Sequence, residues 1–391
     1  MNAAGEKPAR RRTRALILAY ACTPGRGSEP GAGAALARAA SAICDEVTVI
    51  TRPSSMEPSK LAAQLGPNVT VVLAGPRSGT LPTYANYAIW ILRSASKARA
   101  LRRSRSYSVV HHATYASDWL PIPLAFLRKR DGERWVWGPA GGATYPPKEV
   151  TAAVVGAGMR AEALRSALTA ASRRLAHRLL RRRIDVAIAL NPDAALGFAP
   201  LKPGMVLQSS NAALDYDSWP AHRSPEPRTV LFAGRGVAWK GLLPLIQAME
   251  HLPGWTLHIA GTGTDARPYR EAAKPYRDRV IFHGRLDRDD TLELMNKSAV
   301  FALPSLHDSA PWAAAEAAGA GRPVVCLPYG GVSAMAADHA VVADTSAPLP
   351  LALAKAVTRA ESLSLPAFRG HTSDSLQRTL ATAYAIPGIQ K

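Results

Sequence analysis

The chain has 391 residues, 47% of them hydrophobic, and its 48 basic and 29 acidic side chains give a formal net charge of +19. Single cores rarely grow beyond about 250 to 300 residues, so we expect two folded domains, and the composition excludes an intrinsically disordered chain. The charge indicates an anionic partner, such as a membrane surface, a nucleic acid or a phosphorylated substrate.

The N-terminus, MNAAGEKPARRRTRALILAYAC, shares features with a secretory or lipoprotein signal. Its apolar run, residues 15–21, is shorter than a usual signal core and leads into a Gly-rich turn, so we interpret it as a buried strand after a disordered segment, residues 1–13. No segment reaches the roughly 20 apolar residues that span a bilayer. Cys22, Cys44 and Cys326 lack the spacing of a disulfide framework or a zinc site, and we expect a cytoplasmic protein.

Short β-rich runs alternate with Ala/Leu-rich helical stretches. In the first half the predicted strands are RALILAYAC, EVTVITRP, NVTVVLAG, YSVVHHAT, RWVWGPAGG, DVAIAL and GMVLQSS. After the polar, proline-containing SPEPR the pattern restarts with TVLFAGR, WTLHIAG, RVIFHG, AVFALPS and RPVVCLP. Continuous apolar strands separated by helices predict two doubly wound parallel sheets of the α/β class.

The predicted domains are residues 14–207 and 208–371, followed by a C-terminal helix in residues 372–391 that packs back toward the first domain. In such sheets ligands bind at the carboxyl ends of the strands, so we expect a binding cleft where the two domains face each other.

The first strand leads into TPGRGSEPGAGAALARAA, where a Gly-rich turn with Gly25, Gly27, Gly31 and Gly33 precedes a predicted alanine-rich helix. Glycines there let the backbone approach a ligand, and the next helix offers N–H groups to an anion. The spacing matches neither GxGxxG nor the GxxxxGK[ST] loop, so a ligand loop and a merely permissive turn stay open.

In the second half, FAGRGVAWKG places Arg235 just after a strand and Lys240 just before a helix. Two cations at that edge suit a diphosphate, with solvated loop charges as the alternative. The turn AGTGTD, which begins at Gly261, carries the same ambiguity.

The stretch LPSLHDSAPWAAAEAAGAGRPVV holds two carboxylates, Asp308 and Glu316. A helix beginning near Pro311 would offer free N–H groups to a phosphate, while a carboxylate there can accept hydrogen bonds from sugar hydroxyls. Taken alone, Asp308 also fits a loop acid or a helix cap.

Two neighbouring histidines, His111 and His112, end a predicted strand, where alternation directs them to opposite faces. The DYD sequence at residues 215–217 is similar to a metal clamp, but it lies in the linker, and we expect no metal there. A basic helix in residues 165–185 has leucines at helical spacing, so it is either a solvated helix or a face that rests on anionic lipid headgroups.

The second half resembles the donor-binding domain of family 4 glycosyltransferases, which have the two-domain GT-B fold. The elements that carry the resemblance are FAGRGVAWKG and PSLHDSAPWAAAEAAGAGRPVV, within residues 229–331. The first half resembles a subgroup with a GSEPG loop and a WGPxGG turn.

This resemblance implies roles for individual residues. Arg235 and Lys240 would hold the diphosphate of a nucleotide sugar, and Glu316 would bind the ribose hydroxyls. Asp308 replaces a family glutamate that contacts sugar hydroxyls, with one methylene less. Glycines and backbone groups would complete the donor site: Gly234, Gly261, Ser309, Ala310, Pro311 and Trp312.

The first domain would bind the acceptor. Many family members have a histidine where this chain has Gly138 and Pro139, so we expect His111, His112 or backbone groups to meet the sugar. The residues expected to contact the acceptor are Gly27, Ser28, Glu29, Gly31, Gly141 and Gly142.

The resemblance implies a retaining, metal-independent hexosyltransferase that needs no cofactor besides its donor, a UDP- or GDP-linked sugar. The acceptor is a cell-envelope glycan or lipid precursor or a small natural product. We also expect an anionic membrane surface as a partner, with the protein in a peripheral position at the inner face of the cell membrane. Nucleic acid is not an expected partner. The alternative is a catalytically degenerate, basic nucleotide- or nucleic-acid-binding protein with a transferase-like fold.

Overall fold

The structure is a computed structural model that describes residues 12–25, 28–77, 83–115, 117–217, 219 and 224–386, without the side chains of Ser28 and Ala157. All but the last two residues of the predicted disordered N-terminus lie outside these ranges. The chain divides into two compact units. The first comprises Met1–Tyr115, Ile122–Trp137 and Gln377–Lys391, and the second comprises Ala116–Pro121 and Gly138–Leu376.

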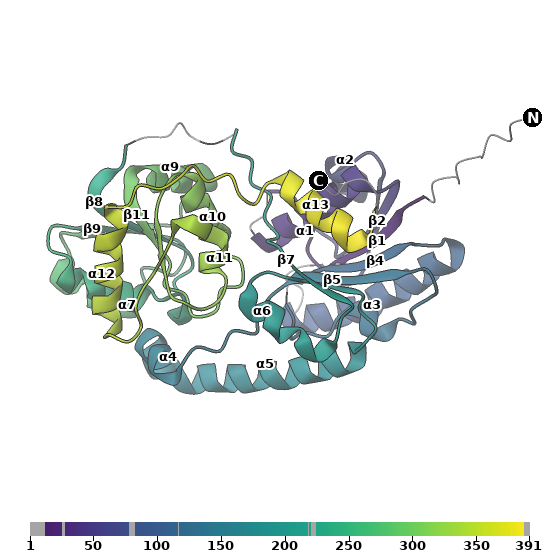
Figure 1. Ribbon diagram of the computed structural model, residues 1–391, viewed down its shortest axis with the longest axis horizontal. Coiled ribbons are helices and arrows are strands. Elements are labelled where there is room, and N and C mark those ends of the chain that lie inside the picture. The colour runs from purple at the N-terminus through teal and green to yellow at the C-terminus, as the bar shows by residue number, and fades with distance from the viewer. Residues whose placement is uncertain are drawn as a thin grey trace, which may run out of the picture. The chain divides into compact units, whose positions relative to one another are not determined.

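A seven-stranded sheet has the order β3-β2-β1-β4-β5-β6-β7, and every strand pair with a described register is parallel (Figure 1). The direction in which successive strands are added to the sheet reverses after β3, so that β4 lies beside β1, as in doubly wound sheets. Its strands are β1 (Arg14–Ala19), β2 (Glu46–Thr51), β3 (Val69–Leu73), β4 (Val109–Thr114), β5 (Arg134–Ala140), β6 (Val186–Ala189) and β7 (Met205–Gln208). The accompanying helices are α1 (Ser28–Ile43), α2 (Pro58–Leu65), α3 (Thr83–Ser104), α5 (Met159–Leu180), α6 (Pro192–Gly197) and α13 (Ser373–Tyr384). Helix α4 (Lys148–Val155) instead packs into the hydrophobic core around the second sheet.

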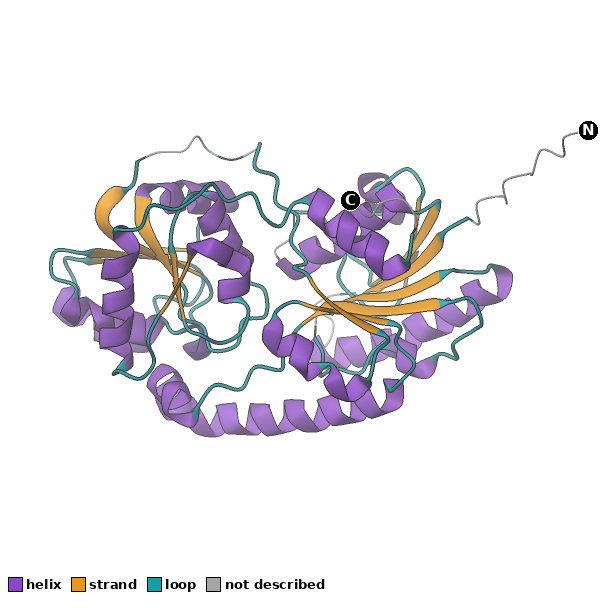
Figure 2. Ribbon diagram, viewed as in Figure 1, coloured by secondary structure: helices purple, strands orange, loops and turns teal. Residues whose placement is uncertain are grey.

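A six-stranded parallel sheet has the order β10-β9-β8-β11-β12-β13, again with the reversal of a doubly wound fold (Figure 2). Its strands are β8 (Glu226–Ala233), β9 (Thr256–Ala260), β10 (Val280–Gly284), β11 (Ser298–Ala302), β12 (Val324–Cys326) and β13 (Ala340–Val342). Its helices are α7 (Leu242–Gln247), α8 (Arg267–Ala273), α9 (Arg288–Lys297), α10 (Trp312–Gly319), α11 (Val332–Ala336) and α12 (Leu349–Glu361).

The central strands are buried along almost their whole length. All six residues of β4 and all five of β11 are buried, as expected for parallel strands covered on both faces. The prediction of two doubly wound parallel α/β sheets is therefore confirmed. Sequence reasoning missed β13, a strand of three residues.

Helix α1 begins at Ser28, several residues before the predicted alanine-rich stretch. Pro30 does not prevent this, because the first turn of a helix leaves its amide groups without intrahelical acceptors. The GSEPG sequence is thus mostly the first turn of a helix rather than a loop.

The three cysteines are buried and form no disulfide. Among the described residues, no helix combines the length and the apolarity that crossing a bilayer requires.

Candidate functional site

The loop after β8 leads through a short 3-10 helix, Ala238–Lys240, into α7. Two glycines in it have no room for a side chain. A Cβ on Gly236 would lie 2.1 Å from the carbonyl oxygen of Gly263, and one on Gly241, whose φ is +74°, would lie 2.2 Å from that of Pro304. The glycines therefore let this loop pack directly against the loops that follow β9 and β11.

Lys240 and Asp308 form an ion pair in which Lys240 Nζ lies 2.6 Å from Asp308 Oδ2. Their side chains are only 12% and 14% exposed, so water screens the pair weakly. The Lys240 ammonium also lies 5.1 Å from the ring centroid of Trp239, which in turn stacks on His307. The structure thus joins two predicted site residues that are 68 positions apart in the sequence.

Arg235 follows the same strand, but its side chain is exposed. Its carbonyl accepts a hydrogen bond from the Val237 amide at 2.9 Å, but within the described part of the chain its guanidinium forms no hydrogen bond or ion pair. The role of Arg235 in holding a diphosphate stays a prediction.

Glu316 is the fifth residue of α10, and its carboxylate is mostly buried. Arg288 Nε lies 3.3 Å from Glu316 Oε1. Burial raises the pKa of Glu316, and the Arg288 charge and hydrogen bond act in the opposite direction. Sequence reasoning missed Arg288, because no motif links the start of α9 to α10.

The loop that enters α10 is held by polar contacts. The carbonyl of Ser309 accepts a hydrogen bond from Asn191 Nδ2 at 2.9 Å, and that of Asp308 accepts one from the Gly331 amide at 2.6 Å. Trp312 Nε1 donates to Asn211 Oδ1 at 3.1 Å. The segment from Ser309 to Trp312 therefore has a defined path, with the first amides of α10 at its end.

Asn191 was also missed, although the sequence carries a signal for it. The DVAIALNPD stretch has Asn directly after a strand and before Pro, an N-terminal helix signature. Asn191 caps α6 by accepting from the Ala194 amide at 2.9 Å. Two residues on, Asp193 Oδ2 accepts from the Gly330 amide at 3.0 Å.

The turn after β5 is equally close-packed. A Cβ on Gly141 would lie 2.4 Å from the Ser309 side chain, and Gly142 has φ +132° with Asp118 Oδ1 only 2.8 Å from where its Cβ would lie. The WGPAGG glycines are therefore required by the packing.

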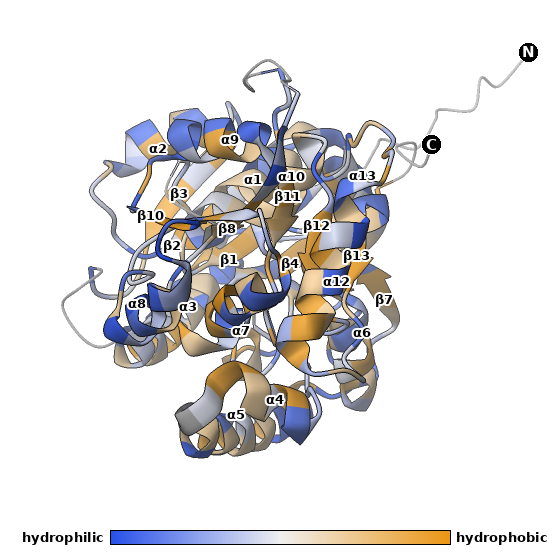
Figure 3. Cartoon of the chain, turned by 90° about the vertical axis from the view of Figure 1, so that its left-hand side faces the viewer, coloured by the Kyte–Doolittle hydropathy of each residue, from blue (hydrophilic) through white to orange (hydrophobic). Residues whose placement is uncertain are grey.

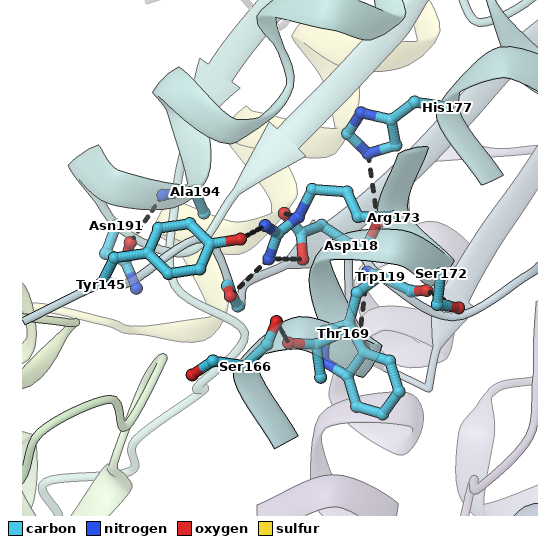
Figure 4. Close-up of polar contacts among 12 residues, drawn as sticks. Asp118, Trp119, Tyr145, Ser166, Thr169, Ser172, Arg173, His177, Asn191 and Ala194 are labelled. Atoms are coloured by element: carbon cyan, nitrogen blue, oxygen red, sulfur yellow. Dashed lines mark hydrogen bonds and ion pairs between the residues drawn. The ribbon is translucent and has the colours of Figure 1, made fainter. Parts of the chain in front are cut away.

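Behind this turn lies a buried ion pair, shown in Figure 4. Arg173 of α5 donates from Nε to Asp118 Oδ2 at 2.8 Å and from Nη2 to Oδ1 at 3.1 Å. Nη2 also donates to the Gly142 carbonyl at 2.5 Å, and Nη1 donates to the Tyr145 hydroxyl. Arg173 thus ties α5 to the turn that holds Gly141 and Gly142.

Burial shifts the pKa values of Asp118 and of the neighbouring His177. It raises the pKa of the Asp118 carboxyl to about 6, against the lowering effect of Arg173, and it lowers the pKa of the neighbouring His177 to about 4. His177 Nε2 lies 3.1 Å from the Asp118 carbonyl, and the buried imidazole packs against the ring of Phe198. None of these residues stood out in the sequence.

The adjacent histidines of β4 lie on opposite faces of the sheet, as predicted. His111 Nδ1 lies 2.7 Å from the Tyr384 hydroxyl of α13, whereas the His112 ring lies 6.2 Å from that of Trp90 in α3. Both imidazoles are fully buried, and burial lowers the pKa of His112 to about 3. A contact between the sugar and either ring stays a prediction.

Of the residues predicted to bind the acceptor near β1, Gly27 lies outside the described residues. Ser28, Glu29 and Gly31 lie at the start of α1. Gly234 and Gly261 pair with the adjoining β9 and β10 segments, because the Gly234 amide donates to Ala260 and the Gly261 amide to Gly284.

Comparisons with known proteins identify a family match in the second half of the chain and a similar fold over most of it. Residues 227–361 match the family model described as Glycosyl transferases group 1. A D-inositol 3-phosphate glycosyltransferase from Xylanimonas cellulosilytica is 35% identical over 129 residues, which are 31% of this chain and 31% of that protein. A glycogen synthase from Mycobacterium tuberculosis is 35% identical over 128 residues, 30% of this chain and 31% of that protein. The chain thus matches less than a third of the length of these curated relatives.

A sucrose-phosphate synthase structure from Thermosynechococcus elongatus aligns with 96% of this chain and 98% of its own, with a TM-score of 0.65 and 16% identity. At that identity the likeness concerns the fold alone, and it confirms the predicted GT-B fold. The region that contains Lys240, Asp308 and Glu316 is therefore a match to the glycosyl transferases group 1 family, in a chain with the GT-B fold.

Proposed function

We propose that the protein is a retaining glycosyltransferase of the family 4 type that moves a hexosyl group from a UDP- or GDP-linked sugar to a hydroxyl acceptor. The observation that carries this proposal is the buried Lys240–Asp308 pair beside the entry to α10, inside the matched residues 227–361. A cation, a carboxylate and the amino end of α10 come together in this loop, as a sugar diphosphate requires.

In the proposed mechanism, positively charged groups of the protein lie where the reaction creates negative charge. Cleavage of the anomeric bond leaves positive charge on the sugar and negative charge on the departing diphosphate. Lys240, Arg235 and the first amides of α10 stabilise the diphosphate, which lowers the barrier without a metal or a protein nucleophile. Asp308 holds the Lys240 ammonium and accepts hydrogen bonds from sugar hydroxyls, and the acceptor attacks on the face that the phosphate leaves.

The proposal is tested by incubating the protein with a panel of nucleotide sugars and mixed acceptors and measuring released nucleoside diphosphate together with product mass. We expect one donor to be turned over in an acceptor-dependent way with retention at the anomeric carbon. Donor binding without any release would instead support the degenerate nucleotide-binding alternative.

Glu316 is proposed to accept hydrogen bonds from the ribose hydroxyls of the donor. Glu316→Gln should raise the KM for the donor by about 10-fold to 100-fold, the effect of losing hydrogen bonds to a charged acceptor, and change kcat much less. Steady-state kinetics with varied donor measures both constants. Glu293→Gln on α9 is the matched control, and a KM equal to that of the wild type would remove Glu316 from the ribose site.

Helix α5 is the surface that we propose for contact with an anionic membrane. Four of its leucines are solvent-exposed, Leu164, Leu168, Leu175 and Leu179, at 61%, 61%, 54% and 44%. The arginines exposed beside them are Arg160, Arg174 and Arg178. Its only acid, Glu162, is paired with Arg165 at 2.9 Å. Figure 3 shows apolar and hydrophilic residues side by side on α5, an arrangement that suits the interface of a negatively charged bilayer.

Leu168→Glu combined with Leu175→Glu should reduce co-sedimentation with vesicles of phosphatidylcholine and phosphatidylglycerol at least about tenfold, because two leucines that would enter the bilayer are lost and two negative charges are added. Leu196→Glu on α6, where the side chain is also exposed, should have no such effect. Wild-type protein that fails to sediment with these vesicles at low salt would favour a small soluble acceptor over an envelope precursor.

A further inference from the structure

A strongly basic pocket lies at the amino ends of β4 and β5, in the first compact unit. Its volume is about 620 Å³, and six cationic side chains line it: Arg99, Arg102, Arg103, Arg128, Lys129 and Arg130. The first three come from the last turns of α3, and the other three come from the segment that precedes β5. The candidate site residues around Lys240 and Asp308 belong to the other unit.

A buried ion pair builds one wall of this pocket. Arg102 donates from Nε to Glu133 Oε1 at 2.7 Å and from Nη2 to Oε2 at 2.5 Å, and both side chains are almost fully buried. Glu133 Oε2 also accepts from the Arg130 amide and from Trp135 Nε1, each at 3.1 Å. Glu133 is thereby committed to Arg102 and to the fold, so it does not neutralise the remaining cations.

Further hydrogen bonds fix the shape of the pocket. Arg102 Nη2 donates to the Arg128 carbonyl at 2.7 Å, and Arg99 Nη2 donates to the Phe126 carbonyl at 2.9 Å. Arg130 Nη1 reaches back to the Arg102 carbonyl. The segment before β5 is therefore held against the end of α3 by the same arginines that line the pocket.

The charges in the pocket are unbalanced. Among the described residues that line it, only Asp131 is acidic, so the formal charges of the six cations and of the Asp131 and Glu133 carboxylates sum to +4. Arg103 and Arg128 are exposed, and within the described residues their guanidinium groups form no hydrogen bond or ion pair. Such gathered cations repel one another unless an anion binds, and the two guanidinium groups offer the paired N–H donors that phosphate oxygens accept.

The pocket lies at the opposite edge of the sheet from the predicted acceptor residues. Ser28 and Glu29 follow the carboxyl end of β1, whereas the pocket precedes β4 and β5. A strand of six or seven residues is about 20 Å long. An anion in this pocket is therefore too far away to be the reacting group of a sugar bound at the carboxyl edge.

We propose that this pocket is a second binding site, specific for a phosphate or diphosphate group, which is either free in solution or the headgroup of an anionic lipid. It acts apart from the proposed donor site, since none of its residues takes part in glycosyl transfer.

The test uses inorganic pyrophosphate as the probe, in calorimetric titrations at low salt. The full-length Lys240→Ala variant serves as the parent, because it removes the donor-site lysine. We expect Arg103→Gln with Arg128→Gln in this parent to weaken pyrophosphate binding at least about tenfold, since charge-assisted hydrogen bonds are lost. Two exposed arginines elsewhere provide the control, Arg267→Gln with Arg277→Gln, and these should leave the affinity within about twofold of the parent. Equal affinity of the pocket variant and the parent would overturn the proposal.

A second arm distinguishes the two sources of phosphate. Vesicles with and without phosphatidylglycerol are sedimented with the wild type and with the Arg103→Gln, Arg128→Gln variant, in the presence and absence of pyrophosphate. Loss of vesicle binding in the variant, with competition by pyrophosphate in the wild type, identifies a lipid headgroup. Unchanged vesicle binding together with lost pyrophosphate binding identifies a free phosphate. Because the calorimetric titrations start from the Lys240→Ala parent, their result does not depend on whether the protein transfers sugar.

Discussion

Lys240→Ala is expected to lower kcat for glycosyl transfer by about 100-fold to 1,000-fold, the range found when one preorganised group that stabilises developing negative charge is removed. The Lys240 ammonium is fixed by Asp308 at 2.6 Å and by the Trp239 ring, so no reorganisation is needed when the diphosphate departs. Release of nucleoside diphosphate at saturating donor measures the effect. Lys355→Ala, in which an exposed lysine of α12 is removed, should leave kcat unchanged.

Two further variants separate the charge of Lys240 from its geometry. Lys240→Arg keeps the positive charge and should retain more activity than Lys240→Ala. Asp308→Asn removes the charge that holds the ammonium, so we expect it to reduce kcat while the donor KM changes less, because the lysine remains able to meet the diphosphate. A Lys240→Ala enzyme with wild-type kcat would contradict the proposed role of this loop.

Arg173→Met is expected to lower the free energy of unfolding by about 3–5 kcal/mol, the cost of leaving the other partner of a buried ion pair unpaired. Asp118 is 0% exposed and receives two hydrogen bonds from Arg173, and the variant also loses the donor to the Gly142 carbonyl. Urea unfolding followed by circular dichroism measures the change. Arg174→Met is the matched control, since the next side chain on α5 is exposed and its loss should cost less than about 0.5 kcal/mol.

The destabilisation should depend on pH in a defined direction. Burial already raises the pKa of Asp118 in the folded protein to about 6, above its value in the unfolded chain. A raised carboxyl pKa means that the folded state binds the proton more tightly, so the associated stability is present at low pH and is lost as pH rises toward the folded pKa. Without Arg173 that pKa rises further. Arg173→Met should therefore be closer to the wild type at pH 5 than at pH 8, and the opposite trend would contradict a charged Asp118 in the native pair.

Much of the fold could be predicted because its signals are local. The apolar runs of β1, β4 and β11 mark strands buried on both faces, and the intervening alanine-rich periods mark helices. The motif that contains Lys240 could be recognised for the same reason: a strand, a glycine turn and a helix follow one another within a few residues. The start of α1 was misplaced because helical periodicity says little about the first turn, where proline is tolerated.

What the sequence by itself determined is therefore the order of the elements, the two doubly wound sheets and the loops that end their strands. Only the tertiary structure decided the partners of the charged side chains: Lys240 with Asp308, Arg288 with Glu316, Arg173 with Asp118, and the arginines that gather between α3 and β5. The physical reason is the distance along the chain over which each effect acts. Periodicity and turn chemistry act over a few residues, whereas an ion pair depends on which distant segments the packed sheets bring within hydrogen-bonding distance, and in this protein those segments are 28 to 68 residues apart.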